Sequence, residues 1–198
     1  MNAVNIATRI RACLSLAVGL GLMACSGRGG VIERLDRDSG LTYVTDPSSP
    51  LAFARTEARF SRSARDYVYL GPVEINERGT RQYYLWVGIG STIDRAFFEV
   101  SRTTPDRLFL ELEGGPTEFE LRPWDELVPR LDGAAVYKPA VEPQVVLGAR
   151  ITLDQLALLA RESIPSVRVT IDAQPTTEYA LWDAGASPWP VFAGYAGD

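Results

Sequence analysis

The sequence predicts a mainly β protein, an antiparallel β-sandwich with one short α-helix at about residues 153–162. Short runs of strand-like residues alternate with turn signals along most of the chain, which is typical of sandwiches and barrels. One segment instead carries apolar residues at helical spacing and ends at a proline. No internal repeat divides the chain, so we expect a single domain over residues 41–198.

The expected strands are rich in aliphatic and aromatic residues and are separated by Gly, Pro, Asp and Ser, which favour turns. In chain order they cover residues 41–44, 51–54, 67–76, 81–89, 96–100, 108–113, 118–121, 145–151, 167–171 and 178–182. The tail from Trp182 to Tyr195 carries aromatic residues between prolines and glycines. We expect it to dock onto the body, because an exposed aromatic tail would promote aggregation.

The segment from residue 67 to residue 90 is expected to form a long β-hairpin. If Arg78 and Gly79 make a two-residue turn, Leu70 lies opposite Val87. That turn needs a positive φ at both positions, which is cheap for Gly and uncommon for Arg. A longer loop with Gly79 in the left-handed conformation is therefore a second possibility, and it can keep the same cross-strand pairing.

One face of this hairpin carries four aromatic side chains, and its glycines lie opposite aromatic rings. Exposed side by side, such rings can stack on a sugar or anchor a protein partner. Alternatively they fill a second core layer, which we favour because aromatic residues in strands are usually packed. The residues of this possible interaction surface are Tyr67, Tyr69, Tyr84 and Trp86.

The predicted helix begins with a capping box. In this motif the Thr152 hydroxyl accepts a hydrogen bond from an unpaired backbone N–H of the first turn, and the Gln155 side chain reaches back to the backbone N–H of Thr152. Pro165 ends it. A second, shorter helix is possible at 123–127, where a proline stands at a tolerated first position. The apolar face of the main helix consists of Leu153, Leu156, Ala157 and Ala160.

The first 25 residues have the three zones of a secretory signal. Arg9 and Arg11 stand in a short start without acids, and residues 12–24 form a small or apolar stretch that is short for a membrane span. The sequence Leu22-Met23-Ala24-Cys25 follows. It resembles the lipobox of bacterial lipoproteins. A signal peptide cut without lipidation, or a short membrane anchor, are the alternatives.

The resemblance implies that residues 1–24 are removed and that the Cys25 sulfur receives a diacylglyceryl group, usually with a further acyl chain such as palmitate on the new N-terminus. Residues 25–40 would then be a lipidated Cys and a flexible tether. Ser26 follows the cysteine where an Asp often retains lipoproteins at the inner membrane. The resemblance therefore implies the inner leaflet of the outer membrane, facing the periplasm. The rest of the chain resembles the small all-β domains of uncharacterised proteobacterial envelope lipoproteins.

Composition excludes several classes of function. The net charge is −5, and removing residues 1–24 takes away two arginines and no acid, so no nucleic-acid partner is expected. The chain has no histidine, and its cysteines are Cys13 and Cys25. Ser-His-Asp and Cys-His catalysis and sites held by imidazole or thiolate are thereby excluded from the folded part. We expect no cofactor and no metal.

Four glutamates alternate with inward-facing apolar residues over 108–121. A pair of carboxylates in a cleft could act on a glycan, but such work needs a raised pKa and hence burial. We favour a solvated strand face, because alternating Glu keeps an exposed face wet. These residues are Glu111, Glu113, Glu118 and Glu120.

Together these patterns predict a non-enzymatic, lipid-anchored envelope protein that binds or scaffolds another envelope component, with an envelope protein as the expected partner. Two alternatives stay open. One is a carboxylate-based enzyme acting on envelope glycan, which requires two carboxylates in one cleft. The other is a carrier of a small apolar ligand, which requires a sizeable internal cavity.

Overall fold

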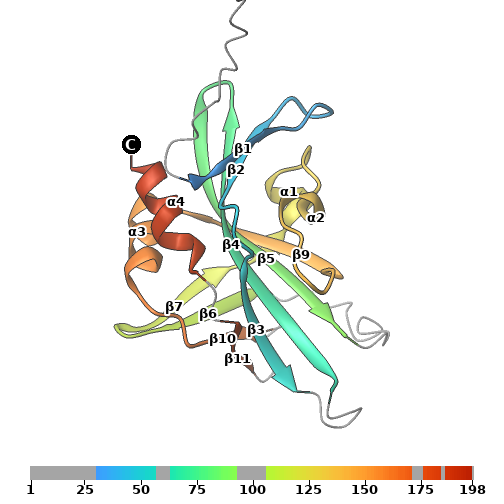
Figure 1. Cartoon of the computed structure of the whole chain (residues 1–198), viewed down its shortest axis with the longest axis vertical. Helices are drawn as coiled ribbons and strands as arrows, with labels where there is room; N and C mark the ends of the chain where they lie inside the picture. Colours follow the sequence, from blue (N-terminus) through green and yellow to red (C-terminus); the bar gives the residue numbers. More distant parts are fainter. Residues whose placement is uncertain (1–29, 57–62, 93–105, 171–175, 184–185, 198) are drawn as a thin grey trace, which may run out of the picture.

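The computed structural model describes residues 30–56, 63–92, 106–170, 176–183 and 186–197. In this part of the chain, eleven strands form one antiparallel sheet with the order β7-β6-β10-β11-β3-β4-β5-β9-β8, and β2 pairs with both β4 and β1 (Figure 1). The mainly β, antiparallel class is confirmed. The two halves that face each other across the core belong to one continuous, strongly curved sheet that is nearly closed.

The elements follow the expected order, although the expected strand at 96–100 lies outside the described residues. The strands are β1 (Ile32–Leu35), β2 (Thr42–Thr45), β3 (Leu51–Thr56), β4 (Arg65–Glu77), β5 (Thr80–Ser91), β6 (Arg107–Leu112), β7 (Gly115–Glu120), β8 (Arg122–Pro123), β9 (Val145–Ile151), β10 (Ser166–Thr170) and β11 (Thr177–Asp183). The helices are α1 (Trp124–Leu127), α2 (Gly133–Val136), α3 (Leu153–Arg161) and α4 (Pro188–Ala196).

The β4–β5 hairpin has the predicted register, with Leu70 opposite Val87. Its turn is the two-residue form: φ is +52° at Arg78 and +88° at Gly79. Two positive φ values match the turn to the twist of the strands. The side chain of Asn76 accepts a hydrogen bond of 2.9 Å from the Gly79 N–H, which holds the turn and helps Arg78 to adopt its uncommon conformation.

The predicted capping box at the start of α3 is confirmed. The Gln155 N–H donates to the Thr152 hydroxyl at 3.1 Å, and the Thr152 N–H donates to the Gln155 side chain at 2.9 Å. The helix ends at Arg161, ahead of Pro165, as expected. Leu156 and Leu159 are buried, and they form the part of α3 that packs into the core.

Because the cap satisfies an otherwise unpaired N–H, the change Thr152→Ala should lower the free energy of unfolding by about 1 kcal/mol. Chemical denaturation of the purified protein measures this, with an unchanged denaturant slope showing that the folded state is intact. The exposed neighbour Asp154 offers a control on the same turn, since no cap bond depends on its side chain. An equal loss for Thr152→Ala and Asp154→Ala would contradict the assigned role of the cap.

The tail docks on the body as expected, but as a helix that the sequence pattern did not predict. Pro188 occupies the first turn of α4, where its missing N–H costs nothing. Trp189 and Phe192 are fully buried against the core. The structure thus contains three helices besides the main predicted one: α4 and the short α1 and α2. Of these, α1 corresponds to the second helix that the sequence allowed at 123–127. In the described residues, no helix has both the length and the apolar character that crossing a bilayer demands.

The expected flexible tether over 25–40 is wrong from Ile32 onward. Residues 32–35 form β1, which pairs with β2, and Asp36 closes the turn between them by accepting a hydrogen bond of 2.9 Å from the Ser39 N–H. Gly40 has a φ of +70°, a value that suits glycine. The tether was expected because the stretch is rich in Gly, Arg and Asp, but Asp36, Ser39 and Gly40 here form a tight hairpin turn.

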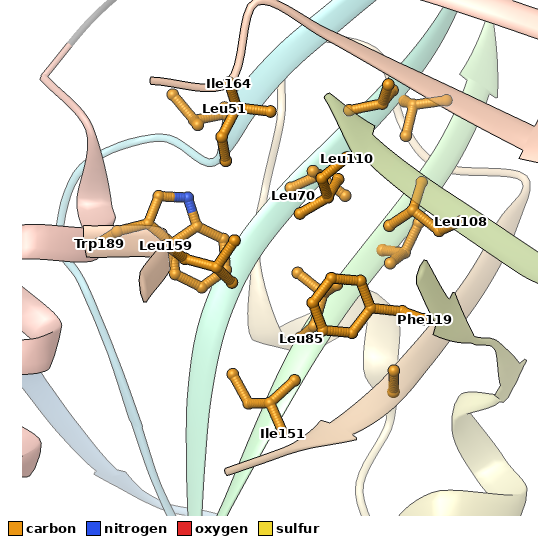
Figure 2. Close-up of a cluster of buried hydrophobic side chains, with 14 of the residues drawn as sticks. Leu51, Leu70, Leu85, Leu108, Leu110, Phe119, Ile151, Leu159, Ile164 and Trp189 are labelled. Atoms are coloured by element: carbon orange, nitrogen blue, oxygen red, sulfur yellow. The ribbon is translucent and has the colours of Figure 1, made fainter. Parts of the chain in front are cut away.

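Two cores lie on opposite faces of β4 and β5. The inner core fills the curved sheet beneath α3 and α4, where Leu70 and Leu110 from the two halves of the sheet lie together and Trp189 closes one side (Figure 2). The outer core lies beneath the segment 124–141, which includes α1 and α2. The hairpin is therefore covered on both sides over most of its length, which explains why both of its faces are apolar.

Candidate functional site: an exposed aromatic cluster at one end of the sheet

Three of the four rings predicted as a possible interaction surface are buried. Tyr69, Tyr84 and Trp86 belong to the outer core, so they do not form an exposed surface, and the alternative of a second core layer holds for them. Trp86 is fully buried, its indole N–H donates to the Gly133 carbonyl at 2.8 Å, and its ring lies 5.2 Å from that of Tyr137. Burial raises the pKa of the Tyr137 phenol, which donates to the backbone of β4.

Glycines on this face of the hairpin and in the covering segment allow that segment to approach the sheet. A Cβ at Gly71 would lie 2.6 Å from the Tyr137 ring, and one at Gly133 would lie 2.6 Å from the Trp124 ring. A Cβ at Gly88 would lie 2.5 Å from the Trp86 ring. Glycine is thus required where rings lie flat on backbone, and the pairing of glycines with aromatics indicates packing here.

Tyr67 is the fourth predicted ring and is only partly buried, packed against the edge of the outer core. Its ring stacks on Tyr69 at 5.6 Å and meets the edge of Trp182 at 6.4 Å. The Arg65 guanidinium lies over the Trp182 ring, 5.2 Å from its centre. Trp182 itself is 56% exposed. We call Arg65, Tyr67 and Trp182 the Trp182 cluster; its tryptophan is exposed to solvent, and its arginine and tyrosine are partly buried beside it.

The sheet brings this cluster together from strands far apart in sequence. β3 lies between β11 and β4, and Ala54 pairs with Tyr67 on one side and Ala180 on the other. Ala52 follows on the same face of β3. Because these side chains are single methyl groups, the Trp182 ring on β11 can reach Tyr67 across the intervening strand. The sequence placed Trp182 both at the end of the expected strand 178–182 and at the start of the tail, but nothing local signals the pairing of β11 with β3.

A buried ion pair supports the cluster from the opposite face of the sheet. Asp66 is fully buried, and its carboxylate accepts hydrogen bonds from Arg55 at 3.0 Å and from the Ser91 hydroxyl at 2.9 Å. The Arg55 guanidinium also lies 5.7 Å from the centre of the Tyr179 ring. These contacts tie β3, β4, β5 and β11 together at the ends that hold the Trp182 cluster, so its residues stand on rigid elements.

The four alternating glutamates lie on an outer strand face, as favoured. Glu113, Glu118 and Glu120 are exposed, and Glu111 pairs with Arg168. Glu118 and Glu120 do line a surface groove of about 510 Å³ together with Glu126, Arg122 and Arg150. Glu118 is ion-paired with Arg107 at 3.0 Å and Glu126 with Arg122 at 3.1 Å, and the side chains of both glutamates are about half exposed. They lack the burial that a carboxyl needs to act as a general acid.

Three further expectations concern a metal, a lipid and a carried ligand. In the part of the chain that the structure describes, no group of three or more His, Cys, Asp or Glu side chains could hold a metal ion. Cys25, the predicted lipidation site, lies outside the described residues. Inside the curved sheet, side chains from α3 and α4 occupy the space in which a carrier would need a cavity (Figure 2).

The fold defines the class to which the protein belongs: a mainly β protein built on one curved antiparallel sheet. Comparison with protein-family models, with curated proteins and with solved structures finds no significant match.

Proposed function

We propose that this chain is a non-enzymatic, lipid-anchored protein of the bacterial cell envelope that binds another envelope protein through the Trp182 cluster. The exposed Trp182 ring, flanked by Arg65 and Tyr67, carries this proposal. Trp, Tyr and Arg are the residues that contribute most to the binding energy of protein interfaces. A large, rigid side chain held in place by its neighbours also loses little entropy when a partner covers it.

Gly30, the first described residue, and the Trp182 cluster lie at opposite ends of the body. Gly30 lies against Val191 of α4, and Tyr195 of the same helix lies beside Glu74, near the far end of β4. The Trp182 cluster contains Arg65, the first residue of β4. Along the strand, Arg65 and Glu74 are about 30 Å apart at 3.3 Å per residue. Lipid on Cys25 would thus hold one end at the membrane and leave the cluster facing the periplasm.

The proposal predicts that Trp182→Ala weakens binding of the partner. A photo-crosslinking amino acid at the exposed neighbouring position 183, which keeps the Trp182 ring, should capture a specific envelope protein from cells that produce the lipidated protein. With that partner purified, Trp182→Ala should weaken binding on the order of 30-fold, the effect of losing about 2 kcal/mol of contact energy.

Leu153 provides the matched control, because it is an apolar residue of similar exposure on another element, at 48%. A crosslinker at position 153 should not capture the partner. The change Leu153→Ala should leave the affinity for the purified partner unaltered. Both alanine variants should keep the wild-type melting temperature, since both side chains are largely exposed. A Trp182→Ala protein that binds the purified partner as tightly as wild type would rule out this surface.

A further inference from the structure

We infer that the outward face of α4 rests on the lipid bilayer that holds the anchor, so that the body sits on the membrane in one orientation. This inference depends on the proposed lipidation of Cys25 and specifies what lies against that end of the protein. Three observations carry it: the composition of α4, the place where the N-terminal segment meets the body, and the length of chain that joins that place to Cys25.

The helix α4 is apolar on all sides. Its sequence from Pro188 to Ala196 contains no charged residue. Trp189 and Phe192 face the inner core, whereas Val191 is 44% exposed and Gly194, one turn further, is also exposed. A helix on the surface of a soluble protein normally carries charged residues on its outer face. An uncharged outer face suits a helix that contacts a nonpolar or interfacial phase.

The described chain begins at this same helix. A Cβ placed on Gly30 would lie 3.4 Å from a Val191 methyl group, so the first described residue lies beside the outer face of α4. In Figure 1, β1, the first described strand, lies next to α4.

The connection to the proposed lipid is short. Five residues lead from Cys25 to Gly30, and a fully extended chain of that length spans at most about 18 Å. Acyl chains on Cys25 lie in the bilayer, so Gly30 and its neighbour Val191 stay within that distance of the membrane surface. A second, apolar contact close to a lipid anchor strengthens the attachment and restricts the orientation of the body.

An ion-pair network fixes α4 to the sheet, so that the orientation of the helix is also that of the body. The Arg81 guanidinium lies over the Tyr195 ring, 5.0 Å from its centre, and bonds the buried Glu74 carboxylate at 2.8 Å. Burial, together with the Glu74 charge, raises the pKa of the Tyr195 phenol, so it stays neutral at this interface. Contact of α4 with the bilayer therefore directs the Trp182 cluster away from it.

A thiol-labelling experiment on the full-length, lipidated protein tests the inference. The chain's cysteines are Cys13, in the predicted signal peptide, and Cys25, whose sulfur the lipid would occupy. Val191→Cys and Gly194→Cys therefore each introduce one free thiol for an environment-sensitive fluorophore. Gly194 tolerates a side chain, because nothing lies within 4 Å of a Cβ built there. Trp182→Cys provides the control at the opposite end.

The labelled proteins are reconstituted into vesicles that contain lipids brominated along the acyl chain. We expect a blue shift and strong quenching from positions 191 and 194, and neither from position 182. Equal quenching at all three positions, or none at 191 and 194, would overturn the inference. The mass of the N-terminal peptide from the same samples separates the two claims: a lipidated Cys25 without quenching refutes only the orientation, whereas an unlipidated N-terminus refutes the proposed function.

Discussion

Replacing Trp86 with alanine is expected to lower the free energy of unfolding by about 3–5 kcal/mol, the range for removing a large aromatic side chain from a core. Trp86 is fully buried and packs on Tyr137, so the change leaves a cavity in the outer core. It also removes the indole N–H that bonds the Gly133 carbonyl at 2.8 Å, which leaves that acceptor without its partner. Urea denaturation followed by circular dichroism measures the loss.

Trp182→Ala is the control for this experiment, because it deletes the same side chain from a position that is 56% exposed. We expect it to change stability by less than about 1 kcal/mol. If both changes lowered the free energy of unfolding by similar amounts, the segment 124–141 would not cover Trp86, and the assignment of an outer core would be wrong. If Trp86→Ala proves too unstable to purify, Trp86→Phe should show a smaller loss in the same direction.

Arg81→Ala is expected to lower the free energy of unfolding by about 3 kcal/mol. Its guanidinium bonds the Glu74 carboxylate at 2.8 Å, and Glu74 is only 1% exposed. Removing the arginine leaves a buried charge without this partner, a change that typically costs 3–5 kcal/mol. The arginine side chain is itself 34% exposed, so solvent screens part of the interaction and the lower end of that range applies.

The double variant Glu74→Gln, Arg81→Ala distinguishes this cause from general damage to β5. Glutamine keeps the shape of Glu74 and removes its charge, so the double variant should be more stable than Arg81→Ala alone. If the double variant lost as much free energy of unfolding as Glu74→Gln and Arg81→Ala lose separately when added together, the proposed coupling would be contradicted. Arg107→Ala offers a matched comparison, because it breaks an exposed ion pair with Glu118 and should cost less than about 1 kcal/mol.

The features predicted correctly from sequence depend on residues close together in the chain. The hairpin register follows from alternation on both sides of Arg78 and Gly79, and the start of α3 follows from two side chains three residues apart. Local chemistry determines both. The aromatic residues of the hairpin were rightly favoured as a core layer, although Tyr67 at the end of the hairpin is only partly buried.

The features that sequence analysis missed depend on long-range contacts. Residues 32–35 have no strong strand pattern and are stabilised by pairing with β2, while α4 contains two prolines and a glycine and is held by burial of Trp189 and Phe192. Tertiary packing overrides local propensity in both cases. The Trp182 cluster depends on the pairing of β11 with β3, which no spacing in the sequence reveals.

The most direct test of the central claim, that the body is held at a membrane by lipid on Cys25, is mass spectrometry of the mature N-terminus from bacterial cells that produce the full chain. We expect an N-terminal peptide that begins at Cys25 and carries a diacylglyceryl group, with the corresponding peptide absent after Cys25→Ser because a hydroxyl cannot form the thioether. An unmodified peptide that begins at any other residue would contradict the lipid anchor, and with it the proposed function.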